Sequence, residues 1–324
     1  MDHVVEDDDN GDIFICRGGR APWHVTHARI DKSLNEIEED AFRDCQRLIQ
    51  VDTHDGIRRV GKRAFRYCTS LRRINLKSAV EVDGEAFYGC ENLESVEFGD
   101  RLEIIGNYAF DGCALKHLKL PSIVTIEKYA FDYCTSLTDV ELSERLQTMG
   151  ERAFLNCKSL QRIAIPLKRD LFVFYQYSQC YNQFGHCKQL ATVDLVGGIH
   201  ETVASLHMES WRTDMIAEIN RINHVLPNTR NSGKTNEIRQ WMNLIIDKMD
   251  HYKAEHCRYV KEGITLLELA LWKTKLGEKE ENSVEGKTKK AKIDADAESF
   301  RRGKRIICGA DMVIKNVLPF LQLE

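Results

Sequence analysis

The residues of this sequence with the greatest potential for chemical reactivity are its cysteines, of which there are 11 among 324 residues. Seven of them belong to a recurring motif, Ala-Phe-x-x-Cys-x-x-Leu, present in six close copies and one looser copy. Thiolates at fixed positions can bind zinc, form disulfides or carry out redox reactions. The seven recurring cysteines are Cys45, Cys68, Cys90, Cys113, Cys134, Cys157 and Cys187.

The spacing of these cysteines argues against zinc, because structural zinc sites use pairs of cysteines separated by two to four residues. No such pair occurs among the recurring cysteines. The acidic N-terminal segment MDHVVEDDDN lacks the basic and apolar regions of a secretory signal, so we do not expect an exported disulfide scaffold. We interpret the thiols as small residues of a buried core, with metal or redox chemistry as the alternative.

Other motifs with chemical potential are weaker. The stretch NSGKT at 231–235 ends like a phosphate-binding loop, but that motif needs a glycine five positions before Gly233, where Asn228 stands. We expect a turn between helices here, with Thr235 or Asn236 as the N-cap of the second helix. Histidines and carboxylates form no catalytic pattern. The sequence therefore predicts a protein without enzymatic activity, cofactor or metal, and an enzyme with no recognisable motif is the alternative.

The motif requires a repeated structural element to position it. Its alanines recur every 21 to 23 residues, a period that is typical of leucine-rich repeats and other solenoids. Apolar residues alternate after each motif leucine, which predicts a short strand, and the Ala-Phe-x-x-Cys spacing fits one helical turn. Stacking of such units would bury a column of phenylalanines beside the cysteines. The phenylalanines are Phe42, Phe65, Phe87, Phe110, Phe131 and Phe154.

The pattern resembles the BspA-like class of leucine-rich repeats, whose mark is I-x-x-x-A-F-x-x-C-x-x-L-x-x-V-x-L. Residues 34–165 carry it with few departures, and looser units extend it to 25–195. The resemblance implies protein–protein recognition and supplies no catalytic residues. Many relatives are displayed on cell surfaces, a location that we do not transfer to a sequence with no visible export signal.

The flanks of the repeats change in composition. A capping strand is expected at DIFICRGG, along which Ile13 and Ile15 alternate with other residues. We predict an α+β protein in which a solenoid of about seven units precedes a helical region. The predicted segments are an acidic N-terminus with the capping strand (1–24), the solenoid (25–200) with an aromatic insertion (167–186), a helical hairpin or cap (201–276), a charged linker (277–304) and a short terminal helix (305–324).

Exposed strand positions should form columns of polar side chains, which suit binding to another protein better than binding to nucleic acid. The aromatic insertion adds a second candidate surface, although its side chains could instead pack over the last repeats. The candidate binding residues are Asp52, Asn75, Glu97, Lys119, Glu141, Asp194, Arg73, His117, Arg162, Phe174, Tyr175 and Tyr177.

Net charge and hydropathy also bear on whether the partner is a membrane, a nucleic acid or a protein. The net charge is −4, and no apolar run is long enough to span a membrane. The basic residues within 287–305 could act as a nuclear import signal or contact nucleic acid. A nuclear adaptor is therefore an alternative to a cytoplasmic scaffold. The simpler interpretation of this segment is a linker that carries charges of both signs. The helix predicted at 236–276 could dock a partner or a second copy of the chain.

Overall fold

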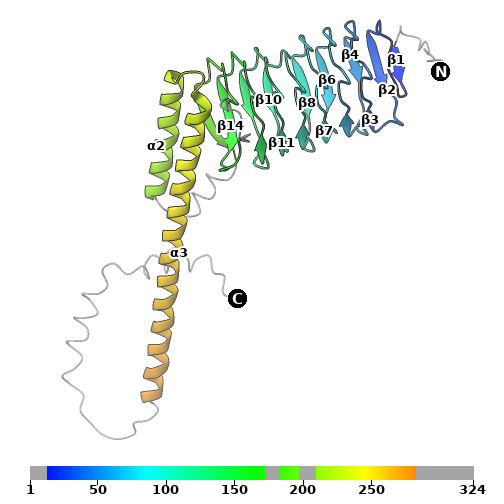
Figure 1. The fold of residues 1–324 in the computed structure, drawn as a ribbon. Helices are drawn as coiled ribbons and strands as arrows, with labels where there is room; N and C mark the ends of the chain where they lie inside the picture. Colours follow the sequence, from blue (N-terminus) through cyan, green and yellow to red (C-terminus); the bar gives the residue numbers. More distant parts are fainter. Residues whose placement is uncertain (1–12, 173–181, 197–208, 282–324) are drawn as a thin grey trace, which may run out of the picture. The chain divides into compact units, whose positions relative to one another are not determined.

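The computed structural model describes residues 13–172, 182–196 and 209–281, which form a parallel β-solenoid followed by helices (Figure 1). The predicted fold, a repeat solenoid with a helical C-terminal region, is confirmed. The chain divides into two compact units, one up to Ile246 and one from Asp247 onward.

Each turn of the solenoid is called a rung here and is named by its motif phenylalanine. The longer strands pair in parallel as three sheets, in the orders β1-β2-β4, β6-β8 and β10-β12-β14-β15. These strands are β1 (Ile13–Cys16), β2 (His27–Ile30), β4 (Gln50–Asp52), β6 (Arg73–Leu76), β8 (Ser95–Phe98), β10 (His117–Lys119), β12 (Asp139–Glu141), β14 (Arg162–Pro166) and β15 (Thr192–Val196).

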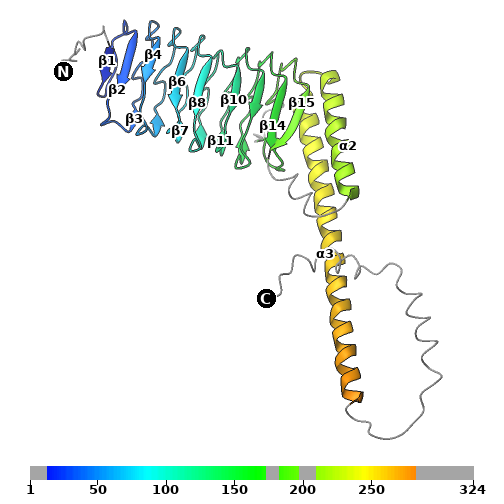
Figure 2. The same ribbon diagram turned by 180° about the vertical axis from the view of Figure 1, so that it is seen from behind.

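Strands of two residues form a fourth parallel sheet, which runs without interruption over six strands on another side of the solenoid (Figures 1 and 2). Each presents one aliphatic side chain to the core. These strands are β3 (Glu36–Ile37), β5 (Arg59–Val60), β7 (Glu81–Val82), β9 (Ile104–Ile105), β11 (Thr125–Ile126) and β13 (Thr148–Met149).

The core is a stack of phenylalanine rings. The six motif phenylalanines are fully buried, and successive rings lie 5.0 to 5.4 Å apart between centroids, within 8° of parallel. The motif alanine beside each ring has no bulk, so neighbouring rungs approach closely. Burial of each ring contributes roughly 1.5–3 kcal/mol.

The Ala-Phe-x-x-Cys stretch differs from the predicted helical turn. In the Phe65 rung, Arg63 and Tyr67 have φ angles of 56° and 60°, in the left-handed region. This alternation sends backbone donors in two directions: Arg66 N bonds to Arg63 O within the rung, and Phe65 N donates to Ala86 O of the next rung at 2.7 Å. The stretch therefore links rungs, which a helical turn could not do because its N–H groups all point along one axis.

The predicted capping strand forms as β1. In β1 the buried side chains are Phe14 and Cys16, and Ile13 and Ile15 are half-buried. Apolar residues occupy both faces of this strand, so alternation alone could not choose between them. The choice follows from the core, because the Phe14 ring packs edge-on against Phe42 at 6.4 Å.

The helical region consists of α2 (Glu209–Val225), a short 3-10 turn η1 (Leu226–Asn228) and α3 (Lys234–Glu281). Helix α2 ends at Val225, and Pro227 lies within η1. Helix α3 continues to Glu281, so the linker predicted from 277 begins too early; the Glu and Lys residues there favour helix. The predicted start at 201 and the terminal helix at 305–324 lie outside the described residues.

Helix α2 and the first turns of α3 close the C-terminal end of the solenoid, where both views show them beside β15 (Figures 1 and 2). Asn223 Oδ1 accepts a hydrogen bond of 2.9 Å from Val193 N on β15. Trp241 is buried and donates its indole N–H to Glu218 O, which fixes the two helices to each other. These helices supply the cover that the open end of a solenoid requires.

Candidate protein-binding surfaces

The recurring cysteines are buried in the core, and their thiols form hydrogen bonds between rungs. Each thiol from Cys68 to Cys187 donates to the carbonyl oxygen of the phenylalanine one rung earlier, at 3.0 to 3.2 Å. Burial raises the pKa of the Cys90 thiol to about 12, so the reactive thiolate is suppressed at neutral pH. Within the described residues, no group of three or more His, Cys, Asp or Glu side chains could hold a metal ion.

The NSGKT stretch has a structural role that the sequence did not indicate. Lys234 is fully buried, and its Nζ donates to Leu190 O at 2.7 Å and Lys188 O at 3.2 Å. The hydroxyl of Thr235 accepts a hydrogen bond from Phe184 N at 3.1 Å. Helix α3 begins at Lys234, so the predicted N-cap at Thr235 or Asn236 is wrong: both lie inside the helix, and Thr235 serves the last rung instead.

The strand face is the surface of the longer strands, and its exposed positions form two columns. Within each sheet the register is regular: Asn75 pairs with Glu97, and Lys119 pairs with Glu141. The columns are interrupted between β4 and β6 and between β8 and β10, where the three sheets meet. The candidate residues Asn75, Glu97, Lys119, Arg73 and His117 are exposed, and Asp52, Glu141, Asp194 and Arg162 are half-exposed.

Several strand-face charges pair across neighbouring rungs. Arg162 bridges Asp139 at 2.9 Å and Asp194 at 2.6 Å, which raises the pKa of the guanidinium. Lys119 lies 3.2 Å from Glu141. Exposed ion pairs of this kind contribute roughly 0–1 kcal/mol each, so a partner can replace them at little cost to the fold.

The aromatic insertion is described only at its edges. Leu171 and Phe172 are buried, and the Phe172 ring packs edge-on against Phe184 at 6.1 Å. The predicted binding residues Phe174, Tyr175 and Tyr177 lie outside the described residues, as does the basic segment 287–305.

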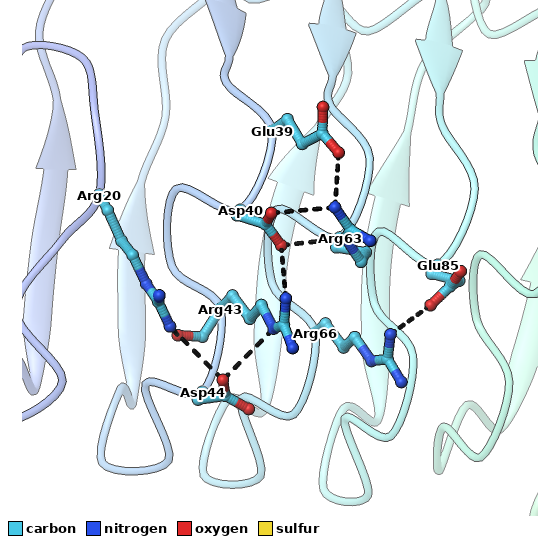
Figure 3. Close-up of polar contacts among 8 residues, drawn as sticks. All are labelled: Arg20, Glu39, Asp40, Arg43, Asp44, Arg63, Arg66 and Glu85. Carbon is cyan, nitrogen blue, oxygen red and sulfur yellow. Dashed lines mark hydrogen bonds and ion pairs between the residues drawn. The ribbon is translucent and has the colours of Figure 1, made fainter.

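The turn face, formed by the residues around each Ala-Phe-x-x-Cys stretch, was not singled out by the sequence analysis. Its first rungs carry an ion-pair network (Figure 3): Arg63 contacts Asp40 and Glu39 at 3.0 and 2.7 Å, and Arg66 contacts Glu85 at 2.6 Å. The signal in the sequence is positional. Three positions of the motif can be compared from rung to rung: the residue before the alanine and the two residues before the cysteine. These positions hold arginines in the outer rungs and tyrosines or aspartates in the middle rungs.

The second unit presents an exposed apolar stretch on α3. Ile264, Leu269, Leu271 and Trp272 are 49%, 55%, 61% and 69% exposed. Successive helical residues turn by about 100°, so these four side chains cover an arc of about 160°. Leu266, which is exposed, and Leu267, which is half-buried, lie on the opposite side, so the stretch is apolar around the helix. Within the described residues, no helix has both the length and the apolarity needed to cross a bilayer.

Comparisons with known proteins agree with the repeat pattern. A family model described as "BspA type Leucine rich repeat region" matches residues 23–85 and 78–183, in six copies. No curated protein matches the chain.

Solved structures of bacterial leucine-rich-repeat proteins also match. A leucine-rich repeat protein of T. pallidum (TpLRR) is 20% identical over 61% of this chain and 88% of its own, with a TM-score of 0.39. A leucine-rich repeat protein from Bacteroides ovatus is 25% identical over 53% of this chain and 61% of its own, with a TM-score of 0.33. A leucine rich cell surface protein from Faecalibacterium prausnitzii is 20% identical over 56% and 62%, with a TM-score of 0.28. This chain spans less than two thirds of the last two proteins. Through residues 23–183, the chain belongs to the BspA-type leucine-rich-repeat family.

Proposed function

We propose that this protein is a non-enzymatic scaffold that binds another protein through the strand face of its solenoid. The supporting observation is the register of that face, which holds polar side chains of successive strands in fixed positions. A preorganised surface loses little side-chain entropy when a partner binds. The mixed charge of the columns favours a protein partner, because a nucleic-acid groove would be dominated by Lys and Arg.

The exposed centre of the strand face offers the sharpest test. Arg73 and Lys119 are both exposed, and reversing their charge as Arg73→Glu with Lys119→Glu should remove complementarity without disturbing the core. Full-length wild type and variant would be used for affinity capture from native cytosol, with quantitative mass spectrometry. The matched control is Lys62→Glu, at an exposed position away from the longer strands. Loss of a partner with the double variant alone supports the proposal, and equal recovery from all three proteins contradicts it.

Self-association through α3 is a second candidate function, favoured by the exposed apolar stretch at 264–272. A helix that is apolar on all sides is normally buried, and a second copy of the chain would supply the missing cover. Analytical ultracentrifugation should give a dimer for the wild type and a monomer for Leu269→Glu with Trp272→Glu. The control is Lys253→Glu on the same helix, which should stay dimeric. A monomeric wild type would refute this candidate.

A further inference from the structure

The middle of the turn face carries a group of tyrosines and aspartates that we call the acidic turn patch: Tyr88, Tyr108, Asp111, Tyr129 and Asp132. These residues come from three successive rungs. The rings of Tyr108 and Tyr129 stack with their centroids 4.7 Å apart. The patch therefore joins aromatic faces to two carboxylates on one continuous surface of the first unit.

Arginines of the protein itself cover the aromatic rings at both ends of the patch. Arg66, one rung before, lies 5.0 Å from the centroids of Tyr67 and Tyr88. Arg152, one rung after, lies 5.4 Å from the centroid of Tyr129 and donates to its hydroxyl. Such cation–π contacts contribute about 0.5–2 kcal/mol. Within the described residues no arginine covers the Tyr108 ring, so the middle of the patch lacks the cation that its two ends have.

Asp111 lies at this gap with its charge uncompensated. Asp132, on the next rung, accepts hydrogen bonds from Asn156 Nδ2 at 3.0 Å and Tyr133 N at 2.8 Å. In the part of the chain that the structure describes, the half-buried Asp111 carboxylate accepts no comparable bond and pairs with no cation.

The titratable groups that face Asp111 are all neutral or acidic. They are Tyr88 on the preceding rung, Tyr108 on its own rung, Asp132 on the following rung and the buried thiols of Cys113 and Cys134 behind it. Burial, followed by the charge of Asp132, raises the pKa of Asp111 to about 7. A cation brought to this carboxylate would offset both effects.

The space beside Asp111 is open. The position before each motif cysteine holds Tyr67 and Tyr133 in the flanking rungs, but Gly89 and Gly112 in the two rungs between them. A Cβ atom at Gly112 would meet only backbone atoms of Gly89, at 3.8 Å or more. At Gly89 a Cβ atom would instead meet the Tyr67 ring at 2.6 Å, so the opening is confined to Gly112. An incoming side chain can therefore approach Asp111 at Gly112, where the tyrosine side chain is missing.

We propose that the acidic turn patch binds a lysine or arginine side chain presented by a partner protein. The cationic group would donate to the Asp111 carboxylate, and its aliphatic stem would lie along the Tyr108 ring. The proposal rests on the proposed scaffold function, but it uses a different face of the solenoid. An RNA or DNA backbone would be repelled by the two aspartates. Calcium prefers six to eight oxygen ligands, more than this pair supplies.

The first experiment measures binding of a fluorescein-labelled peptide, Gly-Gly-Arg-Gly-Lys-Gly-Gly, to the full chain by fluorescence anisotropy. Asp111→Asn should weaken binding about tenfold, and Tyr108→Leu should weaken it several-fold, consistent with the loss of one charge-assisted contact or one aromatic face. The matched control Asp55→Asn removes an exposed carboxylate outside the patch and should bind like the wild type. Equal affinity of the Asp111→Asn protein and the wild type would overturn the proposal.

The second experiment repeats the titration at pH 5.5 and pH 8. Peptide binding to the wild type should be several-fold tighter at pH 8, because Asp111 must be ionised to hold the cation. The Asp111→Asn protein should lose most of this pH dependence, and Asp55→Asn should keep it. The same pH dependence in all three proteins would show general charge attraction and would refute a site at Asp111. The strand-face test uses other residues, so either proposal can fail alone.

Discussion

At the scale of single residues, the recurring cysteine combines two properties that a rung requires. Its side chain is small enough to lie beside the ring stack, and its thiol donates to the phenylalanine carbonyl of the preceding rung. That carbonyl also accepts the backbone N–H of the cysteine in its own rung, so the thiol gives it a second hydrogen-bond donor. A spacing that suggested metal or redox chemistry thus serves to hold adjacent rungs together.

The phenylalanine stack predicts a large loss of stability on truncation. Phe110 contacts Phe87 and Phe131 at 5.0 and 5.4 Å and packs edge-on against Phe98 at 5.8 Å. Phe110→Ala should lower the free energy of unfolding by about 3–5 kcal/mol, because it leaves a cavity between two rungs. Urea denaturation followed by circular dichroism would measure this. Tyr133→Ala, at a side chain that is 53% exposed, should change stability by less than about 0.5 kcal/mol. Similar midpoints for the two variants would contradict the prediction.

Asp111 predicts a pH dependence of stability. Its pKa rises from 3.8 to about 7 on folding, so the folded chain binds this proton more tightly than the unfolded chain does. The resulting stabilisation is fully present below pH 3.8 and is lost as the pH rises through about 7. Asp111→Asn should therefore raise the urea midpoint, relative to wild type, more at pH 8 than at pH 5. Asp55→Asn should show no such difference between the two pH values. A constant effect of Asp111→Asn would show that its pKa is not raised.

At the scale of elements, the sequence predicted strands better than turns. Alternating apolar residues identified the longer strands, because each has one buried face and one exposed face. The Ala-Phe-x-x-Cys stretch was wrongly predicted as a helical turn, because the spacing of apolar residues does not reveal which residues have positive φ angles. A weak signal was present: Asp44, Gly89, Gly112 and Asn156 all precede a motif cysteine, and these residue types tolerate positive φ.

The cap formed by α3 predicts an effect at Lys234. Lys234→Ala should lower the free energy of unfolding by about 2–4 kcal/mol, because two carbonyls of the last rung lose their donor and a buried stem is removed. Lys234→Met keeps most of the stem and should lose less, which separates packing from hydrogen bonding. Urea denaturation measures both, and Lys253→Met at an exposed site on the same helix is the control. No loss in either Lys234 variant would refute the role of Lys234 in the cap.

At the scale of the whole molecule, the fold could be predicted because it repeats. The same sequence pattern occurs seven times, so one irregular copy does not prevent the repeat from being recognised. The candidate surfaces could not be predicted equally well. Exposed strand residues are readable from alternation, whereas the acidic turn patch depends on which side chains lie beside one another across rungs. The role of Lys234 depends on a contact between residues 44 positions apart.

The rung-to-rung hydrogen bonds predict a gradient in local stability within the solenoid. Phe87 N and Phe110 N each donate to the alanine carbonyl of the next rung, deep between neighbours on both sides. Strand β1 has a described neighbour on one side only, β2. Amide hydrogen exchange should therefore be about 100-fold or more slower at Phe87 and Phe110 than at Phe14. Mass spectrometry of exchanged peptides measures this, and uniform protection would contradict it.

The bonding between rungs has a consequence for how such a protein changes over evolutionary time. The Phe N–H to Ala C=O bond is the same at every junction from Phe42 to Phe131, so any rung presents matching donors and acceptors to any other. Duplication or loss of one rung as a cassette would shift the length by about 4.8 Å, the spacing of adjacent strands. Natural variants with different numbers of rungs should therefore keep the buried phenylalanine stack intact and present a longer or shorter binding surface to their partners.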